Sequence, residues 1–210
     1  MFVGRRGLAI HLEPNVSFPK ICDDIIEYGK SKQEQIALTG DYDPETVGEK
    51  DIKDISKKRK SNIVWMSDRW IYNEIQPYVH TANQNAGWNF QWDFSESCQF
   101  TKYKLNQFYD WHCDSWHKPY NKPEQPDRHG KIRKLSVTVS LSDENDYEGG
   151  DFEFDFIDND KGSNQPQLCK EIRPKGSVVV FPSFVWHRVK PVISGTRYSL
   201  VIWNLGWPYK

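Results

Sequence analysis

The sequence predicts a mainly β protein of α+β class, in which N-terminal helices precede a β-sandwich, barrel or jelly roll. Aromatic residues make up 14% of the 210 residues, which favours large rings on pleated sheet faces. Helical spacing of apolar residues is confined to residues 1–88, and short alternating segments replace it from residue 89 onward. Because a chain of this length can bury a core without disulfides, we expect one domain over residues 1–210.

Residues 1–88 are expected to form helical support and a polar loop. Apolar residues recur at helical spacing between residues 18 and 32, and a second amphipathic helix is expected from Ser67 to Ala82. Between these helices, residues 39–61 are polar and contain the run Lys57-Lys58-Arg59-Lys60. Four basic residues among acidic neighbours are typical of a solvated loop, so we interpret the whole segment as a surface loop.

Residues 89–207 are expected to form the β core. Gly, Pro, Asp and Asn separate short alternating segments there, without helical periodicity between them. Such a pattern is typical of a sandwich, barrel or jelly roll. The expected strands cover residues 89–95, 97–105, 108–113, 134–142, 151–156, 168–172, 177–181, 186–192 and 197–203.

Charge and cysteine content exclude several classes of partner and location. Twenty-eight basic and 29 acidic residues leave a net charge of -1, so we expect no nucleic-acid partner. No apolar run approaches the ~18 residues that cross a bilayer, so we expect no membrane contact. The four cysteines form no C-x-x-C pair, which favours a reducing, cytoplasmic location. Oligomeric state is not indicated.

His112 and Asp114 are the first candidates for metal ligands. On a strand, residues i and i+2 point to the same face about 6–7 Å apart. His187 opens another predicted strand, 73 residues after Asp114 (187 − 114), and is the third candidate. Two histidines and one carboxylate form the facial triad of non-haem iron, with open positions for cosubstrate and oxygen.

Four other histidines compete for the same role. His80 lies on the expected second helix and His11 in the N-terminal run, where packing or exposure is the better interpretation. His117 lies five residues after His112 in an expected loop, so spacing alone leaves a His112/Asp114/His117 site open. His129 adjoins Arg128 and is expected to be exposed.

Arg197 follows His187 by ten residues (197 − 187), in an apolar strand whose alternation points it inward. A buried guanidinium requires a carboxylate partner, which can be an internal Asp or Glu or a bound ligand. With the metal ligands nearby, we interpret Arg197 as the site of a dicarboxylate cosubstrate.

From residue 100 to 206, the chain resembles the Fe(II)/2-oxoglutarate-dependent dioxygenases, specifically their prolyl 4-hydroxylase-like and bacterial PKHD-type members. Tyr103-Lys-Leu-Asn-Gln-Phe-Tyr109-Asp-Trp-His112-Cys-Asp114 is similar to the family's Tyr-x-x-Gly-x-x-Tyr-x-x-His-x-Asp. Asn106 stands where the family usually has Gly, and Asn tolerates the left-handed conformation. The series continues in order with Arg133-Lys-Leu-Ser-Val-Thr-Val-Ser-Leu-Ser-Asp, Tyr147-Glu-Gly-Gly-Asp-Phe, Pro174-Lys-Gly-Ser-Val-Val-Val-Phe-Pro-Ser, His187-Arg-Val and Gly195-Thr-Arg197.

The resemblance implies a double-stranded β-helix (jelly roll) that holds Fe(II) on His112, Asp114 and His187. 2-Oxoglutarate would chelate the iron, with its far carboxylate on Arg197 and a hydrogen bond from Tyr103. Tyr109 would be a second donor or would pack beneath the His-x-Asp strand. Ser140 stands where some relatives place a Tyr that holds the far carboxylate.

The implied reaction consumes O2 and 2-oxoglutarate and releases succinate and CO2, with ascorbate as a further candidate reductant. Because Asp114 occupies a position that a halide would need, hydroxylation is favoured over halogenation. A polypeptide residue such as proline and a small molecule both remain candidate substrates. The alternative from another class is a non-enzymatic, carbohydrate-binding jelly roll, in which Trp111, Trp116 and Tyr120 would stack on sugars.

Overall fold

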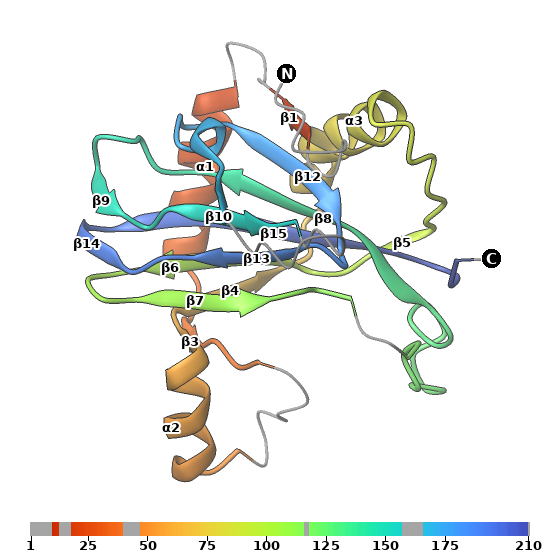
Figure 1. The fold of residues 1–210 in the computed structure, drawn as a ribbon, viewed down its shortest axis with the longest axis horizontal. Helices are drawn as coiled ribbons and strands as arrows, with labels where there is room; N and C mark the ends of the chain where they lie inside the picture. Colours follow the sequence, from red (N-terminus) through yellow and green to blue (C-terminus); the bar gives the residue numbers. More distant parts are fainter. Residues whose placement is uncertain (1–9, 13–17, 40–46, 116–117, 157–165, 210) are drawn as a thin grey trace.

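The structure, a computed structural model, describes residues 10–12, 18–39, 47–115, 118–156 and 166–209. An eight-stranded sheet and a five-stranded sheet, which we call the major and the minor sheet, form the core of the fold (Figure 1). A two-stranded ribbon of β9 (Tyr147–Gly149) and β14 (Val192–Gly195) extends beside them. Every strand pair within these sheets is antiparallel.

The strand order of each sheet interleaves distant parts of the chain. The major sheet runs β1 (Ile10–Leu12), β12 (Val178–Pro182), β8 (Ile132–Ser140), β15 (Arg197–Gly206), β6 (Cys98–Tyr103), β4 (Asn62–Met66) and β2 (Gln35–Ile36), with β5 (Phe94–Ser95) also on β15. The minor sheet runs β11 (Gln167–Leu168), β10 (Phe152–Asp155), β13 (Trp186–Val189), β7 (Phe108–His112) and β3 (Arg59–Lys60).

Helices α1 (Phe18–Lys30) and α3 (Arg69–Asn85) cover the outer face of the major sheet. Their buried apolar residues pack in one cluster with those of the sheet, including Ile25, Ile75 and Leu200. Helix α2 (Glu49–Lys58) instead extends away from the minor sheet beyond β3 (Figure 1). No helix among the described residues is long and apolar enough to cross a membrane.

Alternation along β8 and β15 separates an apolar outer face from an inner face that carries polar residues. Leu200 and Ile202 of β15 join the cluster beneath the helices. Arg197, Ser199 and Val201 point the other way, into a pocket between the sheets. Because side chains on a strand alternate between faces, one sequence supplies both the core and the pocket wall.

The mainly β class and the double-stranded β-helix core are confirmed, and several element boundaries differ from those expected. The described part of residues 39–61 is not a loop, because it contains α2 and β3. Asp68, not Ser67, caps α3, and Pro77 lies inside that helix.

Several strand predictions were too long, and the short strands β1, β2, β3, β4 and β9 were missed. In residues 89–95 only Phe94–Ser95 is a strand, and Asn89 has a positive φ of 50°, outside the β region. Residues 168–172 end in a 3-10 helix, Lys170–Ile172. The strand β4 was not expected, since its apolar run is short.

Candidate active site

The three predicted metal ligands meet between neighbouring strands of the minor sheet. His112 ends β7 and pairs directly with His187 on β13. Asp114 follows β7, and its backbone N–H donates to the Ser183 carbonyl at 2.8 Å. One ligand atom from each of the three residues lies within 4.8 Å of the others, so together they can hold one ion.

Backbone carbonyls orient both imidazoles for metal binding. Nδ1 of His112 lies 2.8 Å from the Asp110 carbonyl, and Nδ1 of His187 lies 2.9 Å from that of Val185. A carbonyl only accepts, so each Nδ1 carries the proton and each Nε2 is left as a ligand. Those two Nε2 atoms lie 3.9 and 3.6 Å from the oxygens of Asp114.

The carboxylate of Asp114 is buried and held in its charged form. Ser136 on β8 donates its hydroxyl to Asp114 Oδ2 at 2.7 Å, which ties the ligand to the major sheet. Burial alone would raise the pKa of Asp114, but His187, His112, Arg133 and the Ser136 hydrogen bond together lower it. A buried carboxylate that stays ionised is suited to bind a cation.

His112 is held neutral by its surroundings. Burial, followed by the facing His187, lowers the pKa of His112 well below its ordinary value. The ring of Tyr109 stacks on it, with centroids 3.4 Å apart. Phe181 packs edge-on against His187 at 4.7 Å. These rings form an apolar shell that limits water around the ligands.

Arg197 lies in the same pocket and has no anionic partner among the described residues. It is only 2% exposed, and its Nη1 donates to the Ser199 hydroxyl at 3.3 Å. Its guanidinium carbon lies 5.5 Å from the centre of the Tyr103 ring, which faces it across the β15–β6 pair. A buried guanidinium without a carboxylate is costly unless a ligand supplies one.

Ser140 supplies a second unused group, on the strand next to the one that carries Arg197. Ser140 pairs with Ser199, on the face of β8 that carries Ser136 and Thr138. Its Oγ is buried and has no hydrogen-bond partner. An orphaned buried hydroxyl and an unpaired guanidinium on neighbouring strands fit a ligand carboxylate.

The structure brings together the predicted site residues and separates the competing histidines. Tyr103 and Tyr109 line the pocket with His112, Asp114, His187 and Arg197. The ring of Tyr109 packs on His112, which was one of its two expected roles. His80 and His129 are exposed at other places in the fold. The side chain of His11 and the whole of His117 lie outside the described residues.

Sequence reasoning missed four residues that shape the pocket. Ser136 orients Asp114, and the alternation of Ser136, Thr138 and Ser140 with apolar residues on β8 is a signal that could have identified it. Trp203 and Gln99 also line the pocket. Arg59, interpreted above as part of a solvated loop, is buried there, and no local pattern indicates this.

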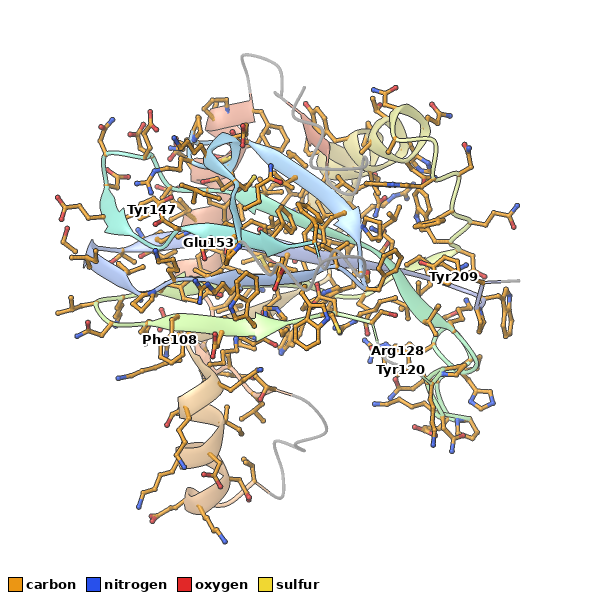
Figure 2. The ribbon with its side chains drawn as sticks, viewed as in Figure 1. Phe108, Tyr120, Arg128, Tyr147, Glu153 and Tyr209 are labelled. Carbon is orange, nitrogen blue, oxygen red and sulfur yellow. The ribbon has the colours of Figure 1, made fainter. Side chains whose placement is uncertain are left out.

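Figure 2 shows the side chains of the described residues on the ribbon. Of the residues labelled in that view, Glu153 lies on β10 of the minor sheet, where Arg188 Nε donates to its carboxylate at 2.7 Å. Tyr120 and Arg128 lie below the far end of the sheets (Figure 2). Tyr120 is half-buried there.

The residues present fit mononuclear iron and a dicarboxylate. Two imidazoles and one carboxylate, all buried, match the donor set of non-haem Fe(II). The unpaired Arg197 and the orphaned Ser140 hydroxyl match the far carboxylate of 2-oxoglutarate.

Comparison with known proteins agrees with this chemistry. Residues 98–204 match the model of the 2OG-Fe(II) oxygenase superfamily. A PKHD-type hydroxylase of Synechococcus sp. (strain CC9902) is 36% identical over 108 residues, which are 51% of this chain and 40% of that protein. Another from strain CC9605 is 41% identical over 96 residues, 45% of this chain and 35% of that protein. The matches thus span less than half of these relatives.

Solved structures share the fold over nearly the whole chain. A viral collagen prolyl hydroxylase from Paramecium bursaria Chlorella virus-1 aligns with a TM-score of 0.60 at 17% identity, covering 95% of this chain and 96% of that one. A Pseudomonas putida prolyl-4-hydroxylase aligns with a TM-score of 0.61 at 15% identity, covering 94% and 91%. At these identities the likeness concerns the fold alone.

Proposed function

Because the chain belongs to the 2OG-Fe(II) oxygenase superfamily, we propose that it is a hydroxylase dependent on Fe(II), O2 and 2-oxoglutarate. One observation carries the proposal: a buried His112/Asp114/His187 set shares its pocket with Arg197, which lacks an anionic partner among the described residues. Bound iron would supply the oxidation, in which one oxygen atom enters a substrate C–H bond and 2-oxoglutarate becomes succinate and CO2.

The chain's own residues would bind, orient and exclude water. His112, Asp114 and His187 would hold the metal, with their protonation already set by the Asp110 and Val185 carbonyls and by Ser136. Arg197 would hold the far carboxylate of 2-oxoglutarate by charge-assisted hydrogen bonds.

Three neighbouring side chains would complete the cosubstrate site. Ser140 and Tyr103 would donate hydrogen bonds to 2-oxoglutarate. Tyr109 would fix the plane of the His112 imidazole by stacking on it. Phe152 and Phe181 would keep the reacting centre dry.

The substrate we propose is a polypeptide residue such as proline or a small molecule. A solved prolyl hydroxylase from Trichoplax adhaerens, in complex with a fragment of the hypoxia-inducible factor degradation domain, shares the fold with a TM-score of 0.61 at 15% identity. We further propose a cytoplasmic location, in keeping with four free thiols, and ascorbate as a reductant.

The test is oxygen consumption coupled to succinate formation. Purified protein with Fe(II), 2-oxoglutarate and a panel of candidate peptides and metabolites should release succinate and consume O2, and mass spectrometry should detect products heavier by one oxygen atom. His187→Ala should do neither. Iron-loaded wild-type protein that forms no succinate would contradict the proposal.

The carbohydrate-binding alternative finds less support in the surface. Trp111 is half-buried beneath the guanidinium of Arg188, whose carbon lies 4.6 Å from the ring centre. Tyr120 is also half-buried, and Trp116 lies outside the described residues. Both described rings are therefore only partly accessible for stacking on a sugar.

A further inference from the structure

A second buried arginine enters the pocket from the N-terminal part of the chain. Arg59 begins β3, the edge strand of the minor sheet, where it pairs with Tyr109 of β7. It is only 5% exposed and lines the same pocket as the metal ligands and Arg197. The neighbours Lys58 and Lys60 are exposed, so Arg59 is the buried member of the basic run.

Every contact of Arg59 within the described residues is with a neutral group. Its Nη2 donates to Gln99 Oε1 at 2.6 Å, and its Nε donates to the Ser61 hydroxyl at 3.0 Å. The guanidinium carbon lies 4.4 Å from the centre of the Tyr109 ring. No carboxylate of the described residues pairs with it, and Nη1 has no acceptor among them. Such a buried charge needs an anion to offset its desolvation.

The sheet register places Arg59 and Arg197 at different levels of the pocket. Arg197 pairs with Tyr103, whereas Gln99, which holds Arg59, pairs with Val201. Four residues along β15 correspond to about 13 Å at the backbone. If Arg197 holds the cosubstrate, Arg59 requires a different anion. Arg59 contacts the ring of Tyr109, which stacks on the metal ligand His112, so this anion would bind near the metal.

We propose that Arg59 is a specificity residue that binds a carboxylate of the substrate. The proposal rests on the proposed function, because it gives the cosubstrate's far carboxylate to Arg197. A planar carboxylate matches the planar guanidinium, and its single negative charge balances the single positive charge of Arg59. The preferred substrate is thus a free amino acid or related small acid, or a peptide with an acidic group beside the hydroxylated residue.

Binding of matched acids and amides to the holoenzyme tests this directly. Protein with Fe(II) and excess 2-oxoglutarate is kept anaerobic, so that the cosubstrate site is filled and no turnover occurs. The first set of probes is free L-amino acids and their carboxamides. The second set is N-acetylated, C-amidated tripeptides with Asp or Glu beside a varied residue, each matched with its Asn or Gln counterpart. Calorimetry and thermal shift measure binding. Free amino acids and tripeptides distinguish an α-carboxylate from a side-chain carboxylate.

We expect acids in at least one set to bind the wild-type protein, and their amides to bind about 30-fold more weakly or not at all. Arg59→Gln should lose this preference. Gln99→Glu keeps the side-chain shape and places a carboxylate at the Arg59 guanidinium, so it should lose the preference too. This second variant keeps the test decisive if Arg59→Gln does not fold. Lys60→Gln, on the exposed neighbour, should keep it.

Equal binding of acids and amides to the wild-type protein, or an acid preference that survives in both variants, would overturn the proposal. So would the absence of any acid that binds. Failure of the proposed function has a separate signature, since wild-type protein and Lys60→Gln would then release no succinate from 2-oxoglutarate in air, whatever the acids do under anaerobic conditions.

Discussion

The two ends of the pocket are built in different ways. Arg197 stands on a ten-residue strand that is paired on both sides, by β6 and β8, near the middle of the major sheet. Arg59 stands on a two-residue strand that, among the described residues, pairs with β7 alone, at the edge of the minor sheet. The first end is fixed by the core of the fold, whereas the second is added by the segment that contains α2.

This difference indicates how one fold can keep a cosubstrate and change its substrate. The match to the superfamily covers residues 98–204, which include Arg197 and the metal ligands but not Arg59. Residues in a doubly paired strand are hard to move without disturbing the sheet. An edge segment can be exchanged with less disturbance, which suits the end of the pocket that we propose for the substrate.

The largest effect is expected from loss of the metal ligands, which lie between the two ends of the pocket. His112→Ala, Asp114→Ala and His187→Ala should each abolish Fe(II) binding and turnover, because the remaining two ligands cannot hold the ion against water. Iron content by metal analysis and succinate release measure this. His117→Ala is the control and should keep both, since its imidazole is not expected in the set.

Loss of iron in His117→Ala with retention in His187→Ala would contradict the metal assignment. Circular dichroism on the same samples separates loss of a ligand from loss of the fold.

The second effect concerns the doubly paired end. Arg197→Ala should raise the KM for 2-oxoglutarate by roughly 30-fold to several thousand-fold, because loss of a buried charge-assisted pair costs about 2–5 kcal/mol. Arg197→Lys should be intermediate, since it keeps the charge and loses the planar fork. Steady-state kinetics at saturating iron, with melting temperature and iron content of each sample, measure this.

Arg197→Ala with bound iron and an unchanged KM would instead make Arg197 a structural residue. The cosubstrate carboxylate would then have to bind elsewhere, and the contrast between the two ends of the pocket would not hold.

The third effect concerns Ser140, on the strand next to the one that carries Arg197, and it changes cosubstrate binding and protein stability in opposite directions. Ser140→Ala should raise the KM for 2-oxoglutarate about tenfold, because a hydrogen bond to a charged group contributes about 1.5 kcal/mol or more. The same change should leave the ligand-free protein equally stable or more stable, since the Ser140 hydroxyl is buried without a partner. Denaturant unfolding and kinetics measure the two changes.

Ser194→Ala, on an exposed serine of β14, is the control and should change neither quantity. A destabilised Ser140→Ala protein with normal KM would show that the hydroxyl serves the fold.

The contrast between the two arginines also marks what the sequence could predict. Arg197 lies in a run of alternating residues, so its inward direction follows from strand periodicity. The ligand set follows from the i, i+2 spacing of His112 and Asp114 on a strand. Arg59 depends on a pairing with Tyr109, 50 residues later (109 − 59), and such contacts leave no local pattern. Its neighbours make it look like part of a solvated run.

Strand boundaries show the same limit. Phe90, Trp92 and Phe94 alternate, yet only the last lies in a strand, since pairing needs a partner edge that β15 offers only to Phe94 and Ser95. Strand β4 was missed because five residues carry too little periodicity. The division at residues 88/89 stays a prediction.

The smallest effect concerns the metal centre between the two ends, in the metal-free protein. The pKa of His112 lies well below its ordinary value, chiefly through burial, so its folded form resists protonation. Between that depressed pKa and about 6.5, the unfolded chain binds the proton that the folded chain does not. The free energy of unfolding should therefore fall as the pH falls through this window, by up to about 1.4 kcal/mol per pH unit for this group.

Chelator-treated wild-type protein and His112→Gln, unfolded in urea between pH 7 and pH 5, isolate the contribution of this imidazole. The variant should lose less stability as the pH falls, because it has no proton to gain at this position. The lowered pKa of Asp114 acts separately, since its stabilisation is lost only as the pH falls below the ordinary carboxyl range. Parallel slopes for the two proteins would mean that His112 is open to solvent when the metal is absent. The metal ligands would then not be held in place before the metal binds. In this they would differ from Arg197, which stands on a central strand, and resemble Arg59, which stands on an edge strand.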